Sequence, residues 1–226
     1  MIKRESCSGC NVCAREVELF SMLDDELQRK IAKDAVHTSR KKGDVILNEG
    51  DKISSIFLIR EGRIKISKIG IDGKEYIQDI LVGGDAIGEE LFMNEEIFPY
   101  NIVCVTDVKL CEVTRENFVK LVSENYEVGI SLISSLLGKL KRANEKNLIL
   151  QENDALIRLV NFMLEIDERT HGDIELTIDN IAASINLRRE TVSRKLKDLI
   201  ELSLIEREGQ SKIKVLDRNG LKNIIS

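Results

Sequence analysis

The chain has 226 residues and a formal net charge of −5, with 42% hydrophobic and 32% charged residues. This length allows two domains with separate cores, and the composition excludes a disordered or membrane-embedded protein. No apolar run approaches the ~20 residues of a membrane span, and the polar start of the chain lacks the apolar core of a signal peptide. We therefore expect a cytoplasmic protein with no membrane partner.

A cluster of cysteines near the start of the chain is the first motif. Cys7, Cys10 and Cys13 are each separated by two residues. This spacing lets three thiolates converge on one iron–sulfur cluster, and a [4Fe–4S] cluster then needs a fourth ligand, for which Cys104 and Cys111 are the candidates. A zinc site made with the same residues, or free thiols, are the alternatives, because a reducing cytosol disfavours structural disulfides.

Short strands separated by turns are predicted next. Apolar residues from Val17 to about Ile31 predict a helical lead-in, after which turn signals recur about every ten residues between Lys42 and Val113. Regular short strands with tight turns indicate a small antiparallel roll or barrel. The predicted strands are Val45–Leu47, Ile56–Ile59, Arg63–Ser67, Tyr76–Ile80 and Ile102–Val105.

One long helix is predicted from residue 116 to about 150. Its seam residues alternate in steps of four and three, which is the spacing of a two-stranded coiled coil. Because several of them are small or polar, we expect a marginal homodimer; a helix that packs on its own domain is the alternative. The seam consists of Gly129, Ile133, Leu136, Leu140, Ala143, Asn147 and Leu150. A linking helix is predicted over residues 152–175, ending at Gly172.

Residues 176–205 predict two short helices joined by a tight turn. Thr177 is placed to cap the first helix, and Asn186 tolerates the left-handed backbone of such a turn. The second helix turns apolar residues inward and polar residues outward. Its outer face carries Arg189, Glu190, Ser193, Arg194 and Lys197. Arg pairs with guanine and Glu accepts from the cytosine amino group, so this face suits base reading; a solvated helix face is the alternative.

Two further features favour DNA binding. The segment from Ile185 to Arg218 holds nine Lys or Arg against six Asp or Glu, a local positive excess in an acidic chain. Residues 204–209 and 212–215 predict two short strands around a turn that contains glycine. Together these features predict a winged helix-turn-helix whose wing, with Lys212, contacts phosphates while the second helix reads bases.

Several motifs in one order resemble the Crp/Fnr family of regulators. They are Gly43–Ile46, Gly50–Asp51, Ile56–Gly62, Gly84–Glu89 and Arg189–Arg194. The resemblance implies an α+β fold with an antiparallel β-roll of the cyclic-nucleotide-binding type, a long dimerisation helix and a C-terminal winged helix-turn-helix. It implies a homodimer on palindromic double-stranded DNA, and RNA polymerase as a partner of an activator. The domains expected are 1–18 (cysteine segment), 19–115 (sensor roll), 116–151 (dimerisation helix) and 152–226 (DNA-binding domain).

The resemblance also suggests a signal. Members that bind cyclic nucleotides place an Arg and a Ser or Thr after the Gly-Glu pair, whereas this chain has no Lys or Arg between Lys74 and Lys109, so no cyclic nucleotide is expected. The oxygen-sensing branch is similar in its N-terminal cysteines and in a strand like Leu110–Val113. This similarity implies that Cys7, Cys10, Cys13 and Cys111 hold a [4Fe–4S] cluster and that Cys104 is a structural neighbour.

The DNA-reading residues resemble the same branch. Glu190, Ser193 and Arg194 are similar to the set used on TTGA-type half-sites, while Arg189 stands where the cyclic-AMP branch carries a base-reading Arg. Other signals for the same fold are haem, a small ligand or direct thiol oxidation. An iron–sulfur electron-transfer protein is the alternative from another class. With only His37 and His171 as histidines, the sequence contains no catalytic constellation and predicts no enzyme.

Overall fold

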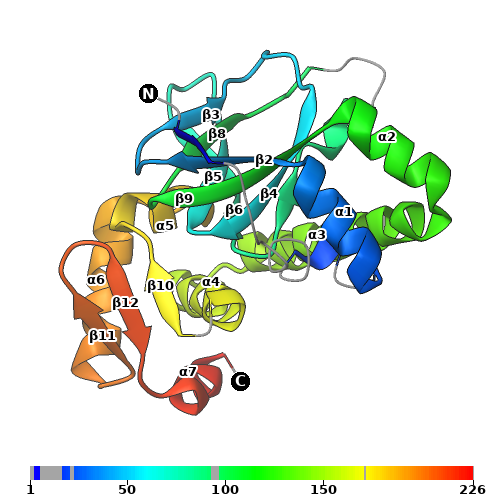
Figure 1. Cartoon of the computed structure of the whole chain (residues 1–226). Helices are drawn as coiled ribbons and strands as arrows, with labels where there is room; N and C mark the ends of the chain where they lie inside the picture. The colour runs from blue at the N-terminus through cyan, green and yellow to red at the C-terminus, as the bar shows by residue number, and fades with distance from the viewer. Residues whose placement is uncertain (1–2, 6–16, 21–22, 93–96, 171, 226) are drawn as a thin grey trace. The chain divides into compact units, whose positions relative to one another are not determined.

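The computed structural model describes residues 3–5, 17–20, 23–92, 97–170 and 172–225 (Figure 1). Cys7, Cys10, Cys13 and His171 lie outside the described residues. The chain forms two compact units, residues 1–68 with 78–139 and residues 69–77 with 140–226. Within the described ranges, no helix is long and apolar enough to cross a membrane.

Two antiparallel sheets form the roll of the first unit (Figure 1). One sheet has the order β1-β2-β9-β4-β7, with bounds Lys3–Glu5, Val36–Arg40, Val108–Thr114, Ser55–Glu61 and Ala86–Ile87. The other has the order β3-β8-β5-β6, with bounds Val45–Leu47, Asn101–Cys104, Arg63–Ile69 and Glu75–Val82. The predicted roll is confirmed, and its five predicted strands correspond to β3, β4, β5, β6 and β8. The edge strands β1 and β7 and the inner strand β2 were not predicted.

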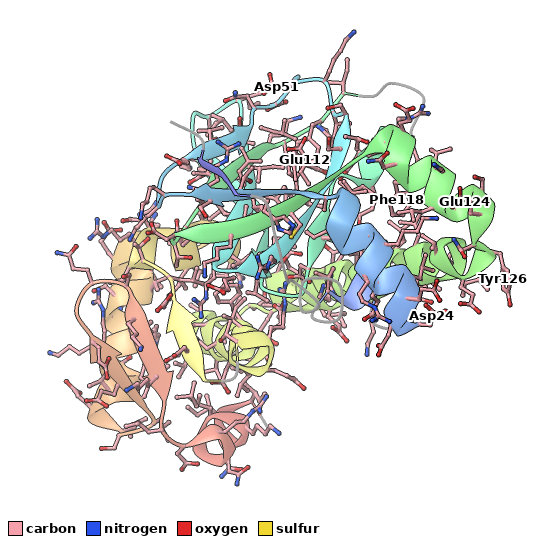
Figure 2. All side chains as sticks on the ribbon, in the orientation of Figure 1. Asp24, Asp51, Glu112, Phe118, Glu124 and Tyr126 are labelled. Carbon is pink, nitrogen blue, oxygen red and sulfur yellow. The ribbon has the colours of Figure 1, made fainter. Side chains whose placement is uncertain are left out.

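Short helices close the hydrophobic core of the roll. They are η1 (Glu18–Phe20), α1 (Asp25–Asp34), η2 (Glu89–Phe92) and α2 (Arg115–Glu124). The predicted lead-in helix is wrong at its start, because α1 begins only where the Asp24 carboxylate accepts from the Leu27 amide at 2.7 Å. Figure 2 labels Asp24 at that end of α1. On α2, the Phe118 ring packs between Phe20 and Phe92 in tilted arrangements, with centroid distances of 6.2 and 5.5 Å.

The single helix predicted over residues 116–151 is two helices, α2 and α3 (Tyr126–Gln151). Asn125 separates them with an extended backbone, φ −142° and ψ 102°. Its backbone amide and its side-chain amide both donate to the Leu121 carbonyl, which ends α2. In Figure 2, Glu124 and Tyr126 mark the two sides of this break.

The second unit contains the predicted winged helix-turn-helix. Its elements are α4 (Ala155–Thr170), β10 (Asp173–Glu175), α5 (Ile178–Ser184), α6 (Arg189–Glu201), β11 (Ile205–Glu208), β12 (Lys212–Val215) and α7 (Arg218–Ile224). The strands pair antiparallel in the order β10-β12-β11. The predicted linking helix is too long, because α4 ends at Thr170, and after Gly172, at φ +103°, the chain continues as β10.

Two glycines of the roll test how closely other backbone atoms approach them. Gly62 has φ +95°, and a Cβ there would lie 2.2 Å from the Asp107 carbonyl oxygen. Gly43 has a similar φ of +88° with nothing within 4 Å. Gly43→Ala should therefore lower the free energy of unfolding by about 1–3 kcal/mol, because the alanine is strained at this positive φ. Gly62→Ala should cost about 1–3 kcal/mol more because of the clash. Urea unfolding measures both, and equal losses would contradict the close contact at Gly62.

Candidate nucleic-acid interface and sensor residues

Local hydrogen bonds fix the angle between α5 and α6. The Thr177 hydroxyl accepts from the Asn180 amide at 3.1 Å and caps α5, as predicted. Asn186 adopts the left-handed backbone predicted for the turn, with φ +52°. From α4, Arg158 donates to the Ile185 carbonyl at 3.2 Å, which secures the end of α5. Since both helices are anchored on the same core, α6 presents a defined outer face.

The outer face of α6 forms an open concavity of about 620 Å³. Its lining includes all five residues predicted for base reading, which are Arg189, Glu190, Ser193, Arg194 and Lys197. All five are exposed, whereas Val192, Leu196 and Leu199 are buried. The concavity also includes Arg207 from β11, which we did not predict because a strand of the wing brings it beside α6 (Figure 1). The set carries more positive than negative charge, as an interface with phosphates requires.

The Arg and Lys residues predicted to contact DNA differ in whether a carboxylate pairs with them. Arg189 lies 3.4 Å from Asp179 and Lys197 lies 3.6 Å from Glu201. Lys212 lies outside the lining of the concavity and pairs across the wing with Asp173 at 3.3 Å. Exposed pairs of this kind contribute little to stability, so DNA phosphates can compete for their cations. Among the residues that the structure describes, no carboxylate pairs with Arg194.

Cys111, one of the two candidate fourth ligands, lies deep in the roll. Its strand β9 pairs with β2 so that Cys111 faces His37, and Cys111 Sγ lies 3.1 Å from His37 Nδ1. The two residues are 1% and 7% exposed. On its other edge β2 pairs with β1, and here the partner of His37 is Glu5, two residues before Cys7. Glu5, His37 and Cys111 are thus neighbours in register across three strands of the sheet.

Cys104, the other candidate, is in a different environment. It ends β8 in the second sheet and is 2% exposed. Burial, followed by the nearby Asp44 carboxylate, raises the pKa of the Cys104 thiol to about 11.

In the turn after β7, the side chains of the chain pair with one another. The Lys139 ammonium of α3 donates to both oxygens of the Glu89 carboxylate, each at 2.7 Å. Glu89 is buried, and burial together with the neighbouring Glu89 charge raises the pKa of Glu90. An anionic phosphate brought here would meet the buried Glu89 carboxylate, the half-buried Glu90 and a lysine that is already paired.

Comparisons with known proteins agree with this architecture. A cyclic nucleotide-binding domain model matches residues 37–125, and a Crp-like helix-turn-helix domain model matches residues 157–224. The probable transcriptional regulator flp of Lacticaseibacillus casei is 26% identical over 217 residues, covering 93% of this chain and 97% of that protein. The transcriptional activator protein FnrL of Cereibacter sphaeroides is 23% identical over 223 residues, covering 93% and 88%.

A solved structure shares the fold. FixK2 from Bradyrhizobium japonicum aligns with a TM-score of 0.76 at 24% identity, covering 85% of this chain and 98% of that one. The two domain models match in the order in which the β-roll and the winged helix-turn-helix occur along the chain. With these matches and relatives that align along nearly its whole length, the chain belongs to the Crp/Fnr family of DNA-binding transcriptional regulators and is not an enzyme.

Proposed function

We propose that this regulator acts as a homodimer and responds to oxygen or redox state through a [4Fe–4S] cluster held by Cys7, Cys10, Cys13 and Cys111. The observation that carries the proposal is the position of Cys111 on β9, which only strand β2 separates from β1 in the sheet; β1 ends two residues before Cys7. A bound cluster would supply oxygen-labile iron–sulfur chemistry. The chain would supply the ligands and transmit their state to the DNA-binding unit.

Chain connectivity makes this ligand set reasonable. Neighbouring strands lie about 4.8 Å apart, and each extended residue adds about 3.3 Å. Glu5 and Cys111 stand on either side of His37, so β1 ends level with Cys111 in the sheet, two residues before Cys7. Among the described residues, no group of three or more metal-binding side chains occurs, so in this proposal the described part of the chain contributes one ligand, Cys111, to a site completed by the N-terminal cysteines.

The turn after β7 supports a signal other than a cyclic nucleotide. The Glu89 carboxylate follows Gly88 in this turn and pairs with the Lys139 ammonium, so it is not available to a ligand hydroxyl. Because α3 also carries the predicted dimer seam, this ion pair connects the roll to the helix that we propose as the dimer interface. A signal received in the roll would thereby bias the position of α3.

Exposed apolar residues on α3 support a second copy of this chain as the partner. Ile133, Leu136 and Leu140 of the predicted seam are 59%, 44% and 57% exposed in the single chain. Seam residues of this kind at heptad spacing are buried when two α3 helices pair. FnrL is named a transcriptional activator, and by analogy we propose that the dimer, once on DNA, contacts RNA polymerase.

The dimer seam has a matched control. Leu140→Asp should convert the dimer to a monomer, because it removes a seam contact worth about 1.5–3 kcal/mol in each copy and places two like charges together. Leu148 is 68% exposed on the same helix but outside the seam, so Leu148→Asp should leave the dimer intact. Light scattering reports the mass of each variant. A Leu140→Asp protein that remains dimeric would contradict the proposed interface.

The response to oxygen is tested by DNA binding before and after exposure to air. Protein purified without oxygen should bind a palindrome of two TTGA-type half-sites whose centres are about one helical turn apart. Exposure to air should weaken that binding, and a scrambled duplex should bind weakly throughout. Unchanged operator affinity after the protein has lost its iron would refute control by the cluster while leaving DNA binding intact.

A further inference from the structure

We propose that His37 is a positioning residue for Cys111, donating a hydrogen bond from Nδ1 to the cysteine sulfur when that sulfur binds iron. The inference rests on the proposed cluster and deepens it, because it assigns a residue that sets how readily the cluster is oxidised. The two side chains belong to neighbouring strands, and their 3.1 Å contact lies in the interior of the roll.

The direction of the hydrogen bond follows from the chemistry of the two groups. A free thiol and an imidazole can each donate to the other. A metal-bound cysteine sulfur has no proton, so only the imidazole N–H can then donate. Because both residues are almost fully buried, water competes little for this contact. The ligated state therefore requires the tautomer of His37 that carries its proton on Nδ1.

A donor at this place alters the cluster in a defined way. A hydrogen bond to a ligand sulfur withdraws electron density from it, which stabilises the more negative, reduced form of a cluster. It also holds the sulfur in one orientation before iron binds. His37 should accordingly raise the reduction potential of the cluster and slow its oxidation by air. Cys104 lies in the other sheet, so His37 is not its strand neighbour.

In the sheet, His37 lies between the strand that carries Cys111 and the strand that precedes the N-terminal cysteines. Its strand neighbours are Cys111 on β9 and Glu5 on β1. The residue that contacts the buried ligand is thus also the backbone partner of the segment that leads to the other three cysteines. Substitution of the imidazole by a side chain without a donor leaves these backbone pairings possible and removes the hydrogen bond to sulfur.

The test compares three substitutions of His37 in the full-length protein, reconstituted with iron and sulfide without oxygen. His37→Phe and His37→Leu have no donor, whereas His37→Gln retains an N–H. The readouts are iron content, the midpoint potential of the visible absorption, the rate of bleaching in air, and the melting temperature of the metal-free protein. The melting temperature identifies a variant that fails to fold. If one of His37→Phe and His37→Leu fails to fold, the other provides the donor-free comparison.

The donor-free variants should show a more negative potential and bleaching on the order of 10-fold faster, the lower end of the effect of losing a group that supports a metal ligand. The potential and the bleaching rate of His37→Gln should lie nearer to those of the wild type. A wild-type protein that holds the cluster, together with donor-free variants of unchanged potential and bleaching rate, would overturn the role of His37 and leave the cluster standing. A wild-type protein that takes up no cluster would overturn both proposals.

Discussion

Replacing Arg194 with Ala should remove discrimination at one base pair of each half-site, at a cost of about 1–3 kcal/mol for the preferred base. Arg194 lies in the concavity of α6, and within the described part of the chain its guanidinium pairs with no carboxylate. It is therefore free to form a bidentate contact with a base edge. Binding measured against a set of duplexes with single base changes reports this loss position by position.

Lys212→Ala is the matched comparison for Arg194→Ala. Because Lys212 lies on β12 outside the concavity, its ammonium is placed for phosphates rather than bases, and DNA phosphates can compete with Asp173 for it. Its removal should weaken binding to all duplexes evenly and reduce the slope of log affinity against log salt by about one. Equal loss of base discrimination in both variants would show that Arg194 does not read a base.

Replacing Lys139 with Met should destabilise the roll by about 3–5 kcal/mol, because it leaves a buried carboxylate without its partner. The Glu89 side chain is 5% exposed and Lys139 is 26% exposed, so solvent screens this pair poorly. Adding Glu89→Gln to Lys139→Met should recover much of the loss, because the buried charge is then absent. Chemical unfolding monitored by circular dichroism measures the free energy of unfolding of each variant.

Lys141 provides the control on the same helix. It pairs with Glu145 at 3.7 Å, but its side chain is 78% exposed. Lys141→Met should accordingly change stability by less than about 0.5 kcal/mol. If Lys139→Met were as mild as Lys141→Met, the ion pair with Glu89 would not stabilise the roll, and its proposed role in connecting the roll to α3 would fail.

Features determined by neighbouring residues could be predicted from the sequence. The outer face of α6, the cap at Thr177 and the turn at Asn186 depend on helical periodicity and on residues within one or two turns. The strands bounded by glycine turns were recognisable for the same reason. Strand β2, with the sequence VHTSR, has one strongly apolar residue and no alternation, so its place in the sheet depends on β9 rather than on its own pattern.

The contacts that shape the candidate sensor site are long-range and could not be predicted in this way. His37 and Cys111 are 74 residues apart, and Glu89 and Lys139 are 50 residues apart. Each pair meets only through strand register or through the path of α3, neither of which is encoded in a short pattern. The break at Asn125 was missed because it involves neither Gly nor Pro. The lack of Lys and Arg between Lys74 and Lys109 was recognised from sequence, but the pairing of Glu89 with the distant Lys139 was not.

The most direct test of control by an iron–sulfur cluster is the visible spectrum, with iron and acid-labile sulfide content, of protein purified without oxygen and then exposed to air. We predict a broad iron–sulfur absorption that bleaches in air in parallel with the loss of DNA binding. It should be absent in Cys111→Ala and retained in Cys104→Ala. Colourless, iron-free protein even after reconstitution, or a cluster that persists in Cys111→Ala, would contradict the proposed sensor.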